Sequence, residues 1–384
     1  MSGDGDIGFV FHERFLQHDP GPAVVGSPPQ PYPYLEPEAH VEHPRRVGRI
    51  KELLDQTGLT SKLRALEFEA ASLDDVALFH TREYIDQVVE LSTRDGYSDA
   101  GEGARLSRGS VEIALLAAGG ACAAVDAVLD GSVARSYALV RPPGHHAVAH
   151  QGMGFCLFGN VAIAVKRALA RGAAERVLIF DWDVHHGNGT QSAFVDDERV
   201  LMVSLHQEGL YPENSGLLDE TGEGSGAGYT VNVPLPAGTG DAGYLETFER
   251  VVAPIARQFG PDLIVVSNGL DASRSDPLGR MMVTAGGCRA LTRSTMALAD
   301  ELCGGQLALV HEGGYSQSYA PLCGLAIIEE LVGVDSGLAD DLGGQARADR
   351  MRPAHEVGLD VERALAEVVA TQQAYWELAV AAAD

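Results

Sequence analysis

The chain has 384 residues, of which 45% are hydrophobic and 21% are charged, an ordinary composition for a globular protein. Its 54 acidic and 28 basic residues give a formal net charge of −26. Because this charge repels phosphate backbones and anionic membranes, we expect neither nucleic acid nor a membrane as a direct partner. It would attract a cationic substrate, although solubility alone is the simpler explanation of the charge.

The cysteines and the N-terminal segment favour a cytoplasmic protein. The 5 cysteines include no C-x-x-C pair, which argues against a disulfide framework and a thiolate zinc site. Residues 1–6 lack the basic segment of a secretory signal. The longest apolar stretch, residues 114–129, includes Asp126, so we expect no membrane-spanning helix.

Short apolar runs typical of strands buried on both faces recur along the chain. They are Ile7–Phe11, Tyr137–Val140, Val177–Phe180, Val200–Ser204, Leu263–Ser267 and Leu307–His311. Helical patterns cover Arg46–Gln56, Glu83–Ser92, Val111–Leu129, Val161–Arg171, Tyr244–Gln258, Ala285–Leu302, Leu325–Gly333 and Val361–Ala382. Pro254 should kink or interrupt its helix. The alternation predicts an α/β fold with a mostly parallel sheet covered by helices on both faces.

We expect a single domain over residues 1–384, because no fixed-period repeat and no long linker divides the chain. The C-terminal helix, with Tyr375 and Trp376, would pack on the core or on a second subunit, so a homo-oligomer is one expectation.

Acidic and histidine residues follow two of the predicted strands. Alternate residues of an extended chain share a face, so Asp181, Asp183 and His185 should point the same way. Asp271 follows another buried strand and should reach the same edge of the sheet. Asp183, His185 and Asp271 would then bind a zinc ion through three protein ligands, with a position left open for water or substrate. One such motif alone would more simply be a loop or capping segment.

Two consecutive histidines, His145 and His146, follow the strand Tyr137–Val140. Histidine carries protons near neutral pH. Asp181 is a candidate acceptor for one imidazole and would favour its charged form, whereas Asn188 would leave the other neutral. We expect one histidine to act electrostatically and the other to move the proton.

Tyr315 ends the segment His311–Tyr315, in which two glycines allow a tight turn. Its hydroxyl could donate to a developing oxyanion. Two aspartate ligands weaken zinc as a Lewis acid, so a second electrophile is chemically useful. By itself the motif would also fit a tyrosine that packs in a turn.

Together these motifs resemble the histone deacetylase family, including its class II-like bacterial amidohydrolases in the acetylpolyamine amidohydrolase superfamily. The resemblance runs from about Gly8 to about Gly333. Its elements are Arg141-Pro-Pro-Gly-His-His, Gly154-Phe-Cys, Asp181-x-Asp-x-His-His-Gly-Asn-Gly-Thr, Ser204-Leu-His, Asp276-Pro-Leu and Glu312-Gly-Gly-Tyr.

The resemblance implies a three-layer arginase/deacetylase-type fold and hydrolysis of an acetylated amine, such as acetyl-lysine, by metal-activated water. It implies zinc on Asp183, His185 and Asp271. It makes His146 the general base and acid, and His145 the electrostatic partner of Asp181. Tyr315 would polarise the scissile carbonyl.

The resemblance also implies two potassium sites and a substrate tunnel. The first potassium site would use Asp181, Asp183, His185, Ser204 and Leu205, and the second the carbonyls of Phe194, Asp197, Val200 and Tyr229. The tunnel walls would be Gly154, Phe155, Tyr211 and Leu278, with Pro143 nearby, and Asp99 on a rim loop would hold the substrate backbone.

Three positions at which members of the family differ narrow the expected function. Asn188 stands where class I members carry an acid, which indicates class II. Tyr315 is retained where poorly active members have histidine, which favours catalysis. Leu278 stands where acetylpolyamine-selective relatives carry an acid, which weighs against polyamines.

The alternative functions are a hydrolase of acetylpolyamines or another small amide, a non-catalytic acyl-lysine reader, and an arginase-like ureohydrolase. The last is disfavoured because it needs more acidic ligands.

Overall fold

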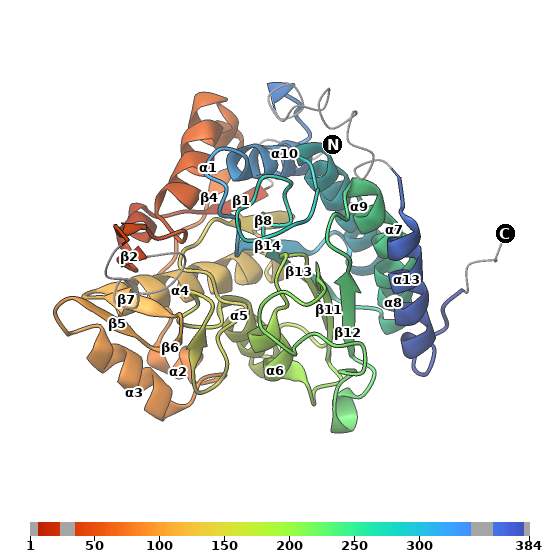
Figure 1. Cartoon of the computed structure of the whole chain (residues 1–384), viewed down its shortest axis with the longest axis horizontal. Helices are drawn as coiled ribbons and strands as arrows, with labels where there is room; N and C mark the ends of the chain where they lie inside the picture. The colour runs from red at the N-terminus through yellow and green to blue at the C-terminus, as the bar shows by residue number, and fades with distance from the viewer. Residues whose placement is uncertain (1–6, 24–34, 339–355, 380–384) are drawn as a thin grey trace.

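A central eight-stranded sheet organises the structure, a computed structural model that describes residues 7–23, 35–338 and 356–379 (Figure 1). The strand order is β12-β11-β10-β13-β14-β8-β1-β4, and each neighbouring pair is parallel. The bounds are β1 Ile7–Val10, β4 Arg64–Ala65, β8 Arg135–Ala138, β10 Val177–Asp181, β11 Val200–Gln207, β12 Thr230–Leu235, β13 Leu263–Asn268 and β14 Leu307–His311. The predicted parallel α/β sheet is confirmed.

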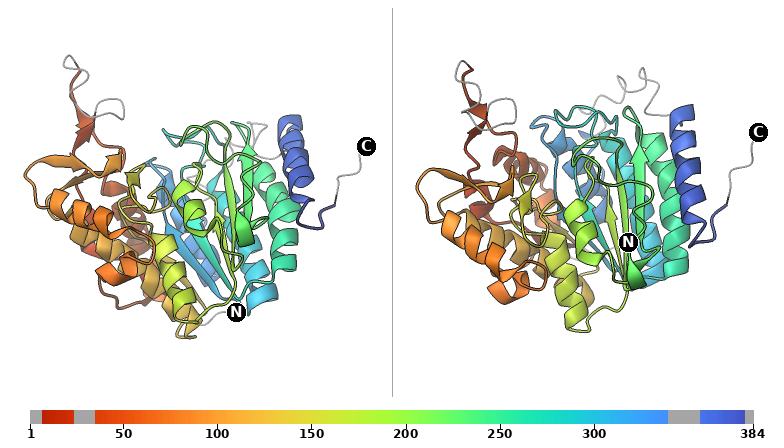
Figure 2. Two further views of the ribbon diagram at one scale, coloured as in Figure 1. Left: turned by 90° about the horizontal axis from the view of Figure 1, so that it is seen from below. Right: turned by 60° about the horizontal axis from the view of Figure 1, so that its bottom comes forward.

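Helices cover both faces of this sheet, which Figure 2 shows between two helical layers. One face packs against α1 (Arg45–Gln56), α7 (Asp241–Thr247), α8 (Ala253–Phe259), α9 (Ala285–Cys303), α10 (Ala320–Val332) and α13 (Leu359–Gln372). On the other face, the apolar core is shared by α4 (Ser110–Leu129), α5 (Asn160–Ala170), α6 (Asn188–Phe194) and the more peripheral α3 (Arg82–Leu91). Alternate residues of the central strands supply the two apolar cores, as the pleat requires.

Minor elements build the loops around the carboxyl edge and the periphery. They are α2 (Leu73–Val76), β2 (Pro22–Ala23), β3 (Glu38–Ala39), β5 (Tyr97–Asp99), β6 (Gly101–Glu102), β7 (Arg105–Ser107) and β9 (Gly152–Met153). The parallel pair β6·β9 fixes a rim loop against the segment that becomes a tunnel wall.

The sequence patterns missed the edge strand β12. Asn232 and Pro234 interrupt its apolar run, and proline is tolerated there because the strand pairs with β11 alone. The expected interruption by Pro254 is present: a π-helical segment, η4 (Phe248–Val252), separates α7 from α8. A widened turn accommodates the missing proline N–H.

Helix α4 and the C-terminal helix α13 bear on two expectations from the sequence, the absence of a membrane-spanning helix and the extent of the last helix. α4 is long and apolar enough to cross a membrane by length and composition alone, but 72% of its apolar window is buried within the fold, as expected of a core helix. The C-terminal helix ends at Gln372 rather than Ala382, and residues 380–384 lie outside the described part of the chain. α13 packs on β12 and η4 of its own chain.

Candidate active site

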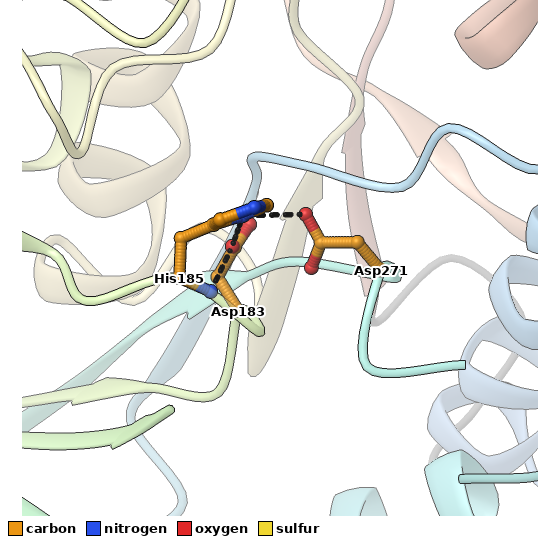
Figure 3. Close-up of side chains that lie close together, drawn as sticks. All are labelled: Asp183, His185 and Asp271. Atoms are coloured by element: carbon orange, nitrogen blue, oxygen red, sulfur yellow. Dashed lines mark hydrogen bonds and ion pairs between the residues drawn. The ribbon is translucent and has the colours of Figure 1, made fainter. Parts of the chain in front are cut away.

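The loops that follow β8, β10, β13 and β14 meet at the carboxyl edge of the sheet and bring the predicted metal ligands together. Ligand atoms of Asp183, His185 and Asp271 all lie within 4.8 Å of one another (Figure 3). His185 Nδ1 lies 3.0 Å from Asp183 Oδ1 and 3.3 Å from Asp271 Oδ2. All three side chains are buried.

The chemistry of this cluster fits a bound divalent cation. Asp271 Oδ2 is buried and has an ion-pair contact with His185 Nδ1 but no well-formed hydrogen bond, and two adjacent buried carboxylates need a compensating positive charge. Against the effect of burial, hydrogen bonds and charges from these carboxylates raise the pKa of His185 to about 10. A metal ion would take the place of that proton. The chain thus has an Asp-His-Asp site that could hold a metal.

We expected Asp181, Asp183 and His185 to point the same way, as alternate residues of an extended chain do. This expectation is wrong, because the backbone is not extended beyond Asp181. Asp183 N donates to Asp181 Oδ1, and His185 N donates to Asp183 Oδ1. These successive turns closed by aspartate side chains direct Asp183 and His185 toward Asp271. Asp181 instead faces the histidine pair.

The histidine pair has the partners expected from the sequence. His145 Nδ1 lies 3.0 Å from Asp181 Oδ2, and His146 Nδ1 lies 2.8 Å from Asn188 Oδ1. Burial lowers the pKa of His145, but the charges of Asp183 and Asp181 outweigh it and raise the pKa to about 10. Burial, then the charges of His145 and His185, lower the pKa of His146. The two imidazoles therefore differ in charge, with His146 neutral.

Tyr315 lies at the same site, with its ring between two side chains. The Arg46 guanidinium is 4.4 Å from the ring centroid, and the Phe155 ring meets it edge-on at 5.6 Å. Burial raises the pKa of the phenol against the opposing charge of Arg46. The hydroxyl thus remains a protonated donor throughout the neutral range.

A cavity of about 340 Å³ leads to these groups. Its lining is Glu102, Gly103, His146, Gly154, Phe155, His185, Leu210, Tyr211, Leu278 and Tyr315. The four predicted tunnel walls are among these residues. Gly154 has a φ of +47°, and a Cβ there would lie 2.3 Å from His146 Cδ2, so only glycine fits.

Two expected substrate residues lie outside this lining. Asp99 Oδ1 accepts from Gly101 N within its own loop, and Pro143 is buried. Glu102 lines the cavity instead. The feature of the sequence that could have indicated Glu102 is its position between two glycines, Gly101 and Gly103.

The residues of the two predicted potassium sites are gathered in space. Asp181 pairs with Ser204 across β10 and β11, next to the candidate metal cluster. In the second set, Asp197 N donates to Phe194 O, Val200 N to Asp197 O, and Met202 N to Tyr229 O. Both cation sites remain predictions.

Buried charged residues without a role in the sequence-based prediction support the catalytic loops. Glu312 Oε2 accepts from Gly144 N at 2.6 Å and from His145 N at 3.1 Å. Burial raises the pKa of Glu312 to about 7. Arg46 donates to the carbonyls of Gly314 and Glu312. The sequence carries no local signal for these long-range contacts to backbone.

The class of protein is defined by the parallel α/β fold together with the site at its carboxyl edge, where a buried Asp-His-Asp cluster lies near two imidazoles and a tyrosine. Residues 40–331 match the family model described as the histone deacetylase domain, and the chain belongs to the histone deacetylase family. This confirms the family expected from the sequence.

Individual relatives cover most of the chain. It is 44% identical over 337 residues to a histone deacetylase-like amidohydrolase of Pseudomonas aeruginosa, covering 87% of this chain and 88% of the relative. It is 40% identical over 331 residues to a probable deacetylase of Archaeoglobus fulgidus, covering 85% and 87%. The crystal structure of the HDA15 HD domain matches with a TM-score of 0.84 at 33% identity, covering 97% of this chain and 96% of that chain. The chain is therefore a hydrolase that deacetylates acetylated amines.

Proposed function

We propose that this chain is a zinc-dependent deacetylase of acetyl-lysine-type amides. The observation that carries the proposal is the convergence of Asp183, His185 and Asp271 beside a cavity with apolar walls, into which His185 and the neutral imidazole of His146 both face. One nitrogen and two carboxylate ligands form a donor set typical of catalytic zinc sites. When bound, the ion would polarise the amide carbonyl and lower the pKa of water.

The chain's own residues divide the remaining chemistry. His146 Nε2 is free to accept the proton of the attacking water, because Nδ1 is held by Asn188 and the ring is neutral. The same nitrogen would return the proton to the leaving amine. Asp181 holds His145, which supplies positive charge beside the reacting atoms. Tyr315 donates its O–H to the carbonyl oxygen as negative charge develops there.

The cavity walls suit an extended alkyl chain. Phe155, Tyr211 and Leu278 line it, and their apolar surfaces would bury the methylene stem of an acylated lysine. Its terminal acetamide would then reach Tyr315 and His146.

A second candidate substrate is an acetylated polyamine. Glu102 contributes a carboxylate to the cavity lining, and a second ammonium group along the substrate would be attracted to it. Replacing Glu102 by glutamine should then raise KM for acetylspermidine while leaving KM for an uncharged acetyl-lysine peptide unchanged. Equal changes for both substrates would rule the second candidate out.

Potassium ions at the two predicted sites, and a cytoplasmic location, belong to the same proposal. Backbone carbonyls and carboxylates are ligands for hard cations. All five cysteines are free, which agrees with a reducing compartment. The net charge of −26 disfavours direct contact with nucleic acid or an anionic membrane.

The deciding experiment combines metal analysis of the purified protein with turnover assays. The substrates are acetyl-lysine, trifluoroacetyl-lysine and acetylspermidine. We expect about one zinc per chain at the Asp-His-Asp site and the highest kcat/KM on an acyl-lysine substrate. Full turnover after complete removal of divalent metal would contradict the proposal.

A further inference from the structure

The loop that presents Tyr315 has little intrinsic means of fixing its own position. Gly313 and Gly314 precede the tyrosine, and Gly314 has a φ of +115°. A Cβ on Gly313 would lie 1.9 Å from Asp271 Oδ2, so the close approach to the metal ligands requires glycine. Without side chains at these two positions, the position of Tyr315 depends on contacts from other segments.

One buried carboxylate supplies such contacts. Asp276 Oδ2 accepts from Tyr315 N at 2.6 Å and from Ser316 N at 3.1 Å. Its other oxygen, Oδ1, accepts from Leu278 N at 2.9 Å. Asp276 is 8% exposed, so water competes little for these charge-assisted hydrogen bonds. The same side chain therefore holds the tyrosine loop and the segment that carries a tunnel wall.

The ring contacts of Tyr315 do not replace this anchor. Arg46 faces the ring and Phe155 meets its edge, which restricts the ring plane. Stacking contacts tolerate sliding more readily than short hydrogen bonds do. Arg46 also donates to the Gly314 carbonyl, but Asp276 is the side chain that accepts from the amide of Tyr315 itself, so it acts most directly on where the tyrosine lies.

We infer that Asp276 is a positioning residue. It holds the Tyr315 hydroxyl and the Leu278 side chain, which lines the cavity, at fixed positions relative to each other. The inference rests on the proposed role of Tyr315. Displacing a catalytic group by about 1 Å can cost about 10²-fold in rate. Loss of Asp276 should therefore lower kcat through Tyr315, although Asp276 belongs neither to the Asp-His-Asp cluster nor to the lining of the cavity.

The chain offers a matched control at the opposite edge of the sheet. Asp262 Oδ2 accepts from Glu175 N at 2.7 Å and from Arg176 N at 3.2 Å. It therefore makes the same kind of contact to two successive amides, but next to the start of β13. A purely structural role for such a carboxylate should appear equally in both aspartates.

The test is a double-mutant cycle on the zinc-loaded full chain, with metal content and melting temperature measured for every variant. Asp276→Ala should lower kcat by roughly 10- to 100-fold, with zinc retained. In the Tyr315→Phe background the same change should lower kcat by less than about threefold, because the group that it positions is gone. Asp262→Ala should lower the melting temperature and leave kcat at the parent value.

Asp276→Asn sharpens the test and replaces the alanine variant if that protein does not fold. Its remaining carbonyl oxygen can still accept from the Tyr315 and Ser316 amides, while its NH2 group would face Leu278 N–H. We expect a smaller loss of kcat than in Asp276→Ala and a rise in KM.

Four outcomes would overturn the inference. They are equal kcat losses in the parent and Tyr315→Phe backgrounds, a kcat loss in Asp262→Ala equal to that in Asp276→Ala, loss of zinc from the Asp276 variants, and parent-like kcat in Asp276→Ala. If Tyr315→Phe itself keeps the parent turnover, the proposed role of Tyr315 fails and this inference fails with it. A slow Tyr315→Phe with an unimpaired Asp276→Ala removes the inference alone.

Discussion

The two edges of the central sheet use similar hydrogen bonds for different purposes. At the amino edge, Asp262 joins the starts of β10 and β13, and Arg257 pairs with Glu301 on the surface, each about half exposed. At the carboxyl edge, buried carboxylates such as Glu312 and Asp276 hold catalytic loops. Burial raises the pKa of both to about 7. The buried carboxylates at the carboxyl edge thus reduce the stability of the folded protein while they hold the catalytic loops in place. The charged residues at the amino edge only join segments of the chain.

The largest expected difference between the edges comes from the proposed metal ligands. Asp271→Asn keeps an oxygen for the hydrogen bond from Val184 N but removes a ligand charge. Because a metal ion bound as proposed would contribute several kcal/mol to the transition state, turnover should fall by at least about 10³-fold. Metal analysis and turnover of Asp271→Asn check this, with Asp262→Asn as the control. Parent-like turnover and zinc content in Asp271→Asn would contradict the assignment of the ligand.

The histidine pair gives the next effect. His146→Gln should lower kcat by about 10² to 10⁴-fold, the usual contribution of a general base. His145→Gln removes a positive charge that lowers the pKa of His146. The pKa of His146 should rise, so the acidic limb of the kcat/KM profile should move to higher pH. Full pH–rate profiles of both variants check this, and equal losses with unshifted limbs would argue against separate roles.

The carboxyl edge also contains a buried imidazole that the proposed chemistry does not use. Both ring nitrogens of His311 lack hydrogen-bond partners, and burial lowers its pKa to about 3. The unfolded chain binds this proton near pH 6.5, so His311 reduces stability progressively as pH falls below that value. His311→Leu should therefore stabilise the protein by about 1–3 kcal/mol at pH 7. The gain should grow by roughly 1.4 kcal/mol per pH unit below 6.5.

His206 is the matched control for that change. It is buried with a pKa lowered by burial to about 3, but its nitrogens lie 3.0 Å from Ser204 Oγ and 3.0 Å from Gly216 O. His206→Leu should destabilise the protein at pH 7, because it leaves these partners unsatisfied. Denaturant unfolding at pH 5 and pH 7 measures both variants. Destabilisation by His311→Leu at both values would mean that His311 has a partner after all.

The comparison of edges also explains what the sequence could predict. β14 was predicted at Leu307–His311 and has those bounds, because a buried parallel strand is a continuous apolar run. The positions of Asp183 and Asp271 followed from the rule that ligands gather at the carboxyl ends of such strands. In contrast, Glu312 binds amides 167 and 168 residues away. Contacts from a side chain to a distant backbone leave no spacing pattern, so they could not be predicted.

The smallest effect is expected at the amino edge, where Arg257→Ala removes the pair with Glu301. Its two hydrogen bonds, 2.8 and 2.9 Å long, join α8 to α9 in contact with solvent. Such pairs gain little, because water screens the charges and both side chains lose rotamer freedom. We expect unchanged turnover and a melting temperature that moves less than in His206→Leu, with the difference shrinking further at high salt. A melting-temperature shift as large as that of His206→Leu, or any loss of kcat, would mean that the amino edge also supports the active site, and the contrast between the edges would fail.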